Sequence, residues 1–244
     1  MPPRISVLIP AFNEEAQLPL TLASVRESFA EVGETAYEII VCDNNSTDAT
    51  TAVAQRHGAR VVFEPHNQIA RARNTAAERS VGEWLIFLDA DTRLNPDLLR
   101  ATLRLLQAGG VCGGGSTVRF DVEKMAPMHS ALMGLWNTIS VRLSLAAGSY
   151  VFCLRQAWEA VGGFDQTVYA GEELYFSRNV KRWGRERRLR FTVIAEAPIV
   201  TSSRKLQWYG QWQMFRHILG MLRPGAHRKR ENCGLWYERP AEKK

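Results

Sequence analysis

The sequence has few of the residues that cross-link small proteins or bind transition metals. It contains four cysteines in 244 residues, and no two of them form a C-x-x-C pair. A disulfide framework and a zinc knuckle are therefore excluded, and a reducing cytosol is the expected compartment. The five histidines form no H-E-x-x-H segment or other dense metal spacing, so none of them is taken as a metal ligand.

Long apolar runs are also missing. The N-terminal run in MPPRISVLIPAFNEE is broken by Pro10 and by acids, and it lacks the length and the cleavage site of a signal peptide. The most apolar long stretch, residues 125–147, contains a proline, a histidine, an asparagine and an arginine. Because a spanning helix needs about 20 consecutive apolar residues, we expect neither export nor a membrane span.

A dinucleotide-binding glycine motif is absent as well. The first apolar run is followed by PAFNEE and not by G-x-G-x-x-G, which argues against a dinucleotide-dependent oxidoreductase. What is present is ordinary for a soluble globular protein, with 45% hydrophobic and 23% charged residues. The formal net charge of +6 comes largely from late basic runs at residues 181–190 and 227–230.

Short apolar runs that end in polar loops are typical of buried parallel strands. They occur at residues 5–9, 38–42 and 84–88. Helical patterns lie around them, over residues 15–30, 49–57 and 68–80. This alternation predicts an α/β fold, a single doubly wound domain with a mostly parallel central sheet.

The second half is less regular. Asn95 and Pro96 predict the cap and first turn of a helix that ends near residue 108. Further strands are expected over residues 111–120, 150–154 and 189–195, the last ending before Pro198. Further helices are expected over residues 126–146, from 156 to the Gly162-Gly163 pair, 172–183 with Gly184 as its stop, and 206–222.

Acidic residues follow three of the predicted strands, at Glu14, at Asp43, and at Asp89 with Asp91. Ligands of open parallel sheets bind beyond the carboxyl ends of the strands, and carboxylates gathered there need a cation to offset their repulsion. An isolated D-x-D pair is more often a turn. The two neighbouring acidic strand ends instead favour a magnesium or manganese site.

Four segments resemble the family 2 glycosyltransferases in order and spacing, over residues 5–205: SVLIPAFNEE, IIVCDNNSTDAT, ARARNTAAERSVGEWLIFLDADT and GGFDQTVYAGEELYFSRNVKRWG. The resemblance implies the GT-A fold, with a Rossmann-like domain. It also implies a nucleotide-diphosphate sugar donor, a divalent metal (Mn or Mg) and inversion at the transferred sugar. Two alternatives are a nucleotidyltransferase-like nucleotide-sugar enzyme, although its Gly-rich triphosphate loop is absent, and a non-catalytic membrane-surface binding module.

The resemblance also implies roles for individual residues. The first donor-binding loop corresponds to Pro10, Ala11, Asn13 and Glu14. The acid near the base corresponds to Asp43, the strand end near the ribose or donor sugar to Asp89 and Ala90, and the metal ligand to Asp91. Where many members have Asp-Gly, this chain has Asn44-Asn45. Arg73 falls near the nucleotide by resemblance, although Arg71 and Arg73 can equally be solvated charges.

The acidic pair Glu172-Glu173 matches the second family motif, in which the second acid usually serves as catalytic base. An inverting transfer needs one carboxylate to take the acceptor proton, so Glu173 is the expected base and Glu172 the runner-up. The plainer interpretation is structural, since acids at the N-terminus of a helix interact favourably with the helix dipole. Arg204 and Lys205 are candidate cations for the leaving diphosphate or solvated charges, and Gly148 permits close approach of the donor sugar.

The expected layout is a catalytic domain over residues 1–205, with a nucleotide-binding half to about 110 and an acceptor half from 111, and then an amphipathic helix with a basic tail over 206–244. Its Trp-rich helix followed by HRKR fits either packing on the domain or a peripheral membrane contact through 206–230, which residues 125–147 can share. We expect a cytoplasmic protein at the inner face of the membrane, with a glycan or lipid-linked acceptor and no nucleic acid.

Overall fold

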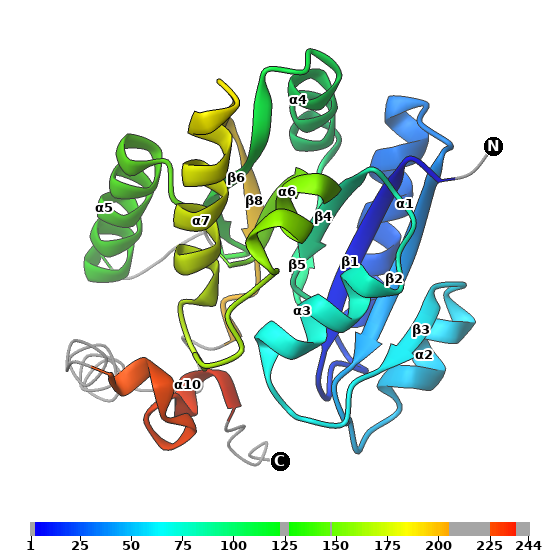
Figure 1. The fold of residues 1–244 in the computed structure, drawn as a ribbon. Helices are drawn as coiled ribbons and strands as arrows, with labels where there is room; N and C mark the ends of the chain where they lie inside the picture. The colour runs from blue at the N-terminus through cyan, green and yellow to red at the C-terminus, as the bar shows by residue number, and fades with distance from the viewer. Residues whose placement is uncertain (1–2, 123–126, 147, 205–224, 238–244) are drawn as a thin grey trace.

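The computed structural model describes residues 3–122, 127–146, 148–204 and 225–237, and its centre is an eight-stranded sheet (Figure 1). The strands are β1 (Ile5–Ala11), β2 (Tyr37–Asp43), β3 (Arg60–Phe63), β4 (Trp84–Leu88), β5 (Thr92–Arg93), β6 (Val111–Phe120), β7 (Tyr150–Leu154) and β8 (Arg190–Thr201). The helices are α1 (Leu18–Val32), α2 (Thr50–Arg56), α3 (Ile69–Glu78), α4 (Pro96–Gln107), α5 (Pro127–Leu143), α6 (Arg155–Val161), α7 (Glu172–Glu186) and α10 (Gly234–Tyr237), with short 3-10 turns at Ala226–Arg228 and Arg230–Asn232.

The sheet has the order β3-β2-β1-β4-β7-β6-β8-β5. Strands β3, β2, β1 and β4 run parallel, as do β6 and β8. Strand β7 runs antiparallel between β4 and β6, and the short β5 pairs antiparallel with β8. The predicted α/β fold with a mostly parallel sheet is therefore confirmed. The polar loops after β1, β2 and β4 meet at one edge of it.

Helices cover both faces of the sheet, because side chains alternate along each buried strand. Ile5, Val7 and Ile9 of β1 pack in the same apolar cluster as α1 and α4. Leu8 points to the other face, where its cluster includes residues of α3, α6 and α7. Figure 1 shows α3, α6 and α7 together in front of the sheet. Helices α3 and α7 are joined at the carboxyl edge of the sheet, where Arg73 of α3 contacts Glu172 at the start of α7. Helix α6 begins at the opposite end of β4, where Arg155 donates to the carbonyls of Gly82 and Ala77.

Gly184, a predicted helix stop, and Pro198, which lies beyond the predicted end of its strand, are both inside regular elements. Gly184 is within α7, and a Cβ built there would lie 2.5 Å from the sulfur of Cys112. The glycine thus permits close packing of α7 on β6 and does not end the helix. Pro198 lies within β8, between the pairs Ser116–Ile194 and Val118–Ile199, where the register shifts. A proline is tolerated there because a bulge needs no ladder hydrogen bond from its nitrogen.

Helix boundaries otherwise follow the sequence signals closely. The Asn95 side chain accepts a hydrogen bond from the Leu98 nitrogen at 2.9 Å, which is the predicted cap of α4. The helix predicted over 206–222 and residue Lys205 lie outside the described residues. Among the described helices, none combines the length and apolar character that crossing a membrane requires.

Candidate active site

Arg73 is the centre of a buried ion-pair cluster at the carboxyl edge of the sheet. Its guanidinium donates to the Glu172 carboxylate at 2.8 Å and to the Asp89 carboxylate at 2.9 Å, and its Nη2 also donates to the Gly148 carbonyl at 2.7 Å. The Arg73 side chain is only 2% exposed. Arg73 therefore joins α3, the end of β4 and the start of α7, and it is not the solvated charge that the sequence left open.

The two acids at the start of α7 have different environments. Glu172 is buried and held by Arg73, whereas Glu173 is half-buried. Burial, followed by the charge of Glu172, raises the pKa of Glu173 to about 8, against the opposing effect of Arg73. The charge of Asp89 also raises the pKa of Glu173. The single Arg73 guanidinium therefore faces three carboxylates, those of Glu172, Glu173 and Asp89. Glu172 is the structural counter-ion and Glu173 is the acid tuned toward neutral pH.

Gly148, which the sequence predicts as a point of close approach for the donor sugar, lies against Glu173. A Cβ added at Gly148 would lie 3.4 Å from the Glu173 carboxyl carbon and 3.6 Å from Arg73 Nη2. Any side chain there would crowd both groups. The predicted neighbours Glu172, Glu173, Asp89 and Gly148 are thus brought together around Arg73.

A second charged group lies where β1, β4 and β8 end. Arg204 Nη2 lies 2.9 Å from both carboxylate oxygens of Glu14 and 3.5 Å from Asp91 Oδ2. Glu14 is buried, and its backbone nitrogen donates to Thr50 Oγ1 at 2.8 Å. The late cation Arg204 therefore faces the acids of the first strand end and of the D-x-D pair. It is not a solvated charge either.

The donor set around Asp91 fits a hard cation. Two carboxylates, from Glu14 and Asp91, converge on the single positive charge of Arg204. Within the described parts of the chain no group of three or more His, Cys, Asp or Glu residues could hold a metal ion. One or two carboxylates completed by substrate phosphates is the usual arrangement for magnesium. Such a site matches this geometry better than an all-protein cage.

The loops after β1 and β2 fix each other. Asn13, with a φ of 52°, donates its nitrogen to Ser46 and accepts from the Thr47 nitrogen at 2.7 Å. Asp43 accepts from the Ser46 nitrogen at 2.9 Å. Pro10 and Ala11 are paired with Cys42 and Asp43 in the sheet, and Ala90 is buried after β4. These residues all lie at the predicted sheet edge.

The Asn44-Asn45 pair has a structural explanation. Asn45 has a φ of 66°, a conformation that asparagine tolerates better than most residues. The buried Asn44 side chain donates to the carbonyls of Glu64 and His66 and accepts from the Gln68 nitrogen at 2.8 Å. Asn44 therefore holds the β3–α3 loop in place at the site.

A polar cleft of about 500 Å³ lies beside these loops. The sequence analysis missed most of its lining, which includes Phe12, Asn45, His66, Arg71, Tyr169 and Arg230. No strand was predicted between residues 57 and 68, so the end of β3, with Glu64 and His66 after it, gave no signal. No sequence signal near Tyr169 or Arg230 points to a contact with residues so distant in the chain.

Residues 225–237 pack beside this cleft and contribute Arg230 to its lining. The Tyr169 nitrogen donates to the His227 carbonyl at 2.7 Å, and Arg230 donates to the Asn67 side chain at 3.1 Å. The Ile69 nitrogen donates to the Tyr237 hydroxyl at 3.3 Å. Part of the basic tail, for which the sequence left packing on the domain and a membrane contact open, is therefore docked on the domain beside the cleft.

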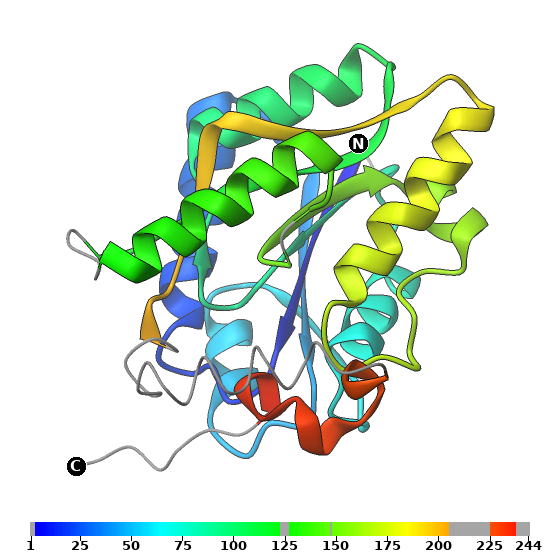
Figure 2. The same cartoon turned by 90° about the vertical axis from the view of Figure 1, so that its left-hand side faces the viewer.

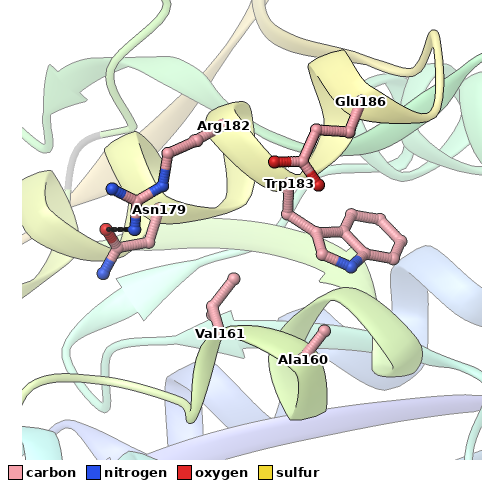
Figure 3. A pocket seen from close by; sticks show the side chains of 6 residues that line it. All are labelled: Ala160, Val161, Asn179, Arg182, Trp183 and Glu186. Atoms are coloured by element: carbon pink, nitrogen blue, oxygen red, sulfur yellow. Dashed lines mark hydrogen bonds between the residues drawn. The ribbon is translucent and has the colours of Figure 1, made fainter.

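A smaller cavity of about 220 Å³ lies between α6 and the C-terminal half of α7 (Figure 3). Ala160, Val161 and Trp183 form its apolar part, while Arg182 lies 3.5 Å from the Asn179 side-chain oxygen. None of the predicted site residues lines it. The larger cleft is lined by Phe12 and Asn45, which lie in the same loops as the predicted residues Asn13 and Asp43, and it is therefore the candidate site.

Comparison with known proteins decides the family. The profile described as glycosyl transferase family 2 matches residues 6–154, which is more than half of the chain. The chain belongs to glycosyl transferase family 2. An uncharacterised glycosyltransferase of Mycobacterium tuberculosis is 37% identical over 87 residues, 36% of each chain. Glycosyltransferase AglE of Haloferax volcanii is 27% identical over 187 residues, 72% of this chain and 60% of that protein.

Solved structures share the fold of this family 2 chain. Mannosyltransferase PcManGT from Pyrobaculum calidifontis, in complex with GDP-Man and Mn2+, superposes with a TM-score of 0.68 at 21% identity, covering 93% of this chain and 62% of that one. Glucosyl-3-phosphoglycerate synthase from Mycobacterium tuberculosis, in complex with Mn2+, UDP and phosphoglyceric acid, gives 0.60 at 19% identity, with 98% and 80% covered. The similarity covers only about a third of the first mycobacterial relative's length. These similarities establish the GT-A-like fold.

Proposed function

We propose that this chain transfers a sugar from a nucleotide-diphosphate donor to an acceptor hydroxyl, with inversion at the anomeric carbon and with a divalent metal, Mn or Mg. One observation carries the proposal. Three acids lie at the same edge of the sheet, beside a polar cleft. Glu14 and Asp91 are suited to bind a cation, and Glu173 is a separate acid. Family membership and the metal and nucleotide sugars bound by the solved relatives support it.

In this reaction Glu173 is the general base. Its carboxylate takes the acceptor hydroxyl proton, and the hydroxyl oxygen forms the new bond to the anomeric carbon. The bond from that carbon to the diphosphate oxygen breaks, and its electron pair leaves with the diphosphate. Glu172 is unsuited to this task, because its carboxylate is buried and held by Arg73 at 2.8 Å. Arg73 keeps the base in place through Glu172 and Gly148.

The leaving diphosphate needs compensating positive charge. A divalent metal supplies it as a Lewis acid, and Asp91, with Glu14 beside it, would hold that metal. Arg204 faces the same two carboxylates and is positioned to neutralise a phosphate oxygen. Lys205, the other predicted cation, lies outside the described residues and stays a prediction.

Replacing Asp91 with Ala tests the metal assignment. We expect the variant to bind uridine and guanosine nucleotide sugars equally with and without Mn²⁺. In the presence of Mn²⁺ its donor affinity should fall about 10- to 100-fold below that of the unmodified chain, the usual loss at a metal site. Isothermal titration calorimetry measures this directly. Asp97→Ala is the control, since Asp97 is exposed on α4; an unchanged Mn²⁺ dependence in Asp91→Ala rules out the assignment.

The polar cleft is the proposed place of the nucleotide. It lies beyond the ends of β1, β2 and β3, beside Asp43, and its volume of about 500 Å³ is in the range of small-molecule sites. Phe12 and Tyr169 supply aromatic surface, and Arg71 and Arg230 supply positive charge. Pro10, Ala11 and Asn13 form the adjoining loop, and Asp89 with Ala90 leads toward the donor sugar.

Replacing Arg230 with Gln tests the role of the 225–237 segment in this cleft. The affinity for uridine or guanosine diphosphate should fall about tenfold, because a charged hydrogen-bond donor at the ligand is lost. Arg228→Gln is the matched control, since Arg228 donates to Thr167 and does not line the cleft. Equal affinities of the two variants, measured by calorimetry, would remove Arg230 from the nucleotide site.

The acceptor is proposed to be a glycan or a lipid-linked intermediate, with the protein working in the cytoplasm at the inner face of the membrane. The support is the sequence of residues 206–230, in which an apolar, Trp-rich stretch precedes HRKR. Residues 205–224 lie outside the described part of the structure. The proposed division into a catalytic domain to residue 205 and a separate C-terminal element rests on the same sequence pattern.

A further inference from the structure

Helix α5 carries a stripe of apolar side chains that faces solvent. Leu132, Leu135, Ile139 and Leu143 are 50%, 57%, 37% and 55% exposed. Their spacing of three and four residues puts them on one face of the helix. We call these four residues the α5 stripe. Five of the eight large apolar residues that are exposed in the described chain lie on this one helix, so the patch is not the usual scatter of single surface residues.

The opposite side of α5 is the one that contacts the protein. The Asn137 side chain accepts from the Val118 nitrogen and donates to the Val118 carbonyl, both at 3.0 Å. Ser140 is buried and donates to the Leu145 carbonyl. In Figure 2, α5 lies in front of the other described elements. The helix is thus fixed on its polar inner side, and its apolar stripe points outward.

Exposed arginines flank this stripe. Lys181 of α7 donates to the Leu143 carbonyl, which brings the C-terminal end of α5 against α7. Helix α7 carries the exposed Arg178 and Arg185, which we call the α7 arginines, whereas Arg182 lines the cavity between α6 and α7. Burial and the charges of Arg185 and Arg178 lower the pKa of Lys181, so positive charge is crowded here.

We propose that the α5 stripe and the α7 arginines together bind the surface of an anionic membrane, with α5 lying in the interface. An apolar face bordered by cations is the pattern of interfacial helices. With 17 residues, α5 is about 25 Å long at 1.5 Å per residue, shorter than the roughly 30 Å hydrocarbon core. It therefore lies along the membrane and does not cross it.

Charge decides against a second copy of this chain as the occupant. A symmetric dimer through the α5 stripe would bring two sets of α7 arginines together, and like charges at close range repel. A membrane rich in anionic lipid attracts the same arginines, each contributing favourably near the surface. In such a membrane the α5 stripe contacts the acyl chains and the α7 arginines contact the anionic headgroups.

Vesicle flotation of the full chain tests the proposal. The intact protein should float with vesicles of equal parts phosphatidylglycerol and phosphatidylcholine at low salt. Leu132→Gln/Leu135→Gln should lower the partition coefficient at least about tenfold, because two buried leucines are lost from the interface. Leu20→Gln is the matched control, because Leu20 is 48% exposed on α1, away from the stripe.

The arginines are tested separately. Arg178→Gln/Arg185→Gln should lower binding to the same vesicles about 30-fold at low salt, at roughly one kcal/mol per charge, and the difference should shrink as salt is added. Arg100→Gln/Arg104→Gln, on the exposed side of α4, is the control. Both control variants should float like the intact chain.

Four results overturn the proposal. The intact chain fails to float, or the leucine variant floats as well as Leu20→Gln. A leucine variant that turns a dimer into a monomer by light scattering assigns the stripe to a second copy. A melting temperature several degrees below that of Leu20→Gln shows that another part of the chain covers the stripe. Donor affinity, measured with soluble nucleotide sugars, should be unchanged, which separates this test from that of the proposed function.

Discussion

Glu173→Gln is expected to bind donor normally and to turn over about 10²- to 10⁴-fold more slowly, the usual loss for a general base. The amide keeps the size of the side chain but cannot accept a proton from the acceptor. Single-turnover kinetics with a saturating nucleotide sugar measure the chemical step, and calorimetry measures donor affinity. Glu172→Gln is the matched comparison, since it alters the acid that Arg73 holds.

The pH profile gives a second, independent readout of Glu173. Because the pKa of Glu173 is raised to about 8, kcat/KM of the unmodified enzyme should rise with pH and level off above about 8. Stability changes with pH in the opposite direction to activity. A carboxyl whose pKa is higher in the folded state adds to the free energy of unfolding below its unfolded-state pKa, and this contribution is lost as pH rises through 8. Glu173→Gln should therefore gain stability relative to the unmodified chain from pH 5 to 9. If Glu172→Gln shows the slow turnover and Glu173→Gln does not, Glu172 is the base.

Arg73→Met should lower the free energy of unfolding by about 3–5 kcal/mol, the range for removing one partner from a buried ion pair. Glu172, 4% exposed, and Asp89 would keep their charges without the guanidinium that now lies 2.8 and 2.9 Å away. Lys cannot replace Arg73, because a single ammonium does not bridge two carboxylates in this fork geometry. Denaturant titration at pH 7 measures the loss, and Arg104→Met on α4 is the control.

Two further measurements separate charge from packing at Arg73. At acid pH the carboxylates can protonate, so the penalty of Arg73→Met should shrink as pH falls. The double variant Arg73→Met/Glu172→Gln should be more stable than Arg73→Met, since one uncompensated charge is gone. Equal stability of Arg73→Met and Arg104→Met at pH 7 would falsify the structural role of this cluster.

The sequence indicated the parts of the site that local patterns encode. Asp89 and Asp91 follow a fully apolar run, so their place at a strand end needed no tertiary information. Arg73 was ambiguous because its partner Glu172 is 99 residues away, and no helical periodicity reports such a contact. Likewise, the antiparallel direction of β7 between β4 and β6 depends on the path of the chain and not on its apolar pattern.

The predicted ends of α7 and β8 were wrong for a related reason. Gly184 and Pro198 are strong local breakers, yet packing against Cys112 and a bulge beside β6 keep both inside regular elements. Tertiary packing outweighs local propensity at such positions. Asn95 was predictable as a cap because its partner, the Leu98 nitrogen, is three residues away.

Residues 225–237, which add Arg230 to the cleft, are synthesised late, so the cleft is completed late in co-translational folding. The hydrogen bond between the Ile69 nitrogen and the Tyr237 hydroxyl joins residues 168 positions apart in the chain. Strands β1 to β4 therefore leave the ribosome long before the cleft is complete. At about 5–20 residues per second, that delay lasts on the order of ten seconds or more. Nascent chains therefore pass through a stage with the sheet edge in place but without Arg230, and they should gain the share of nucleotide affinity that Arg230 supplies only when residues 225–237 dock.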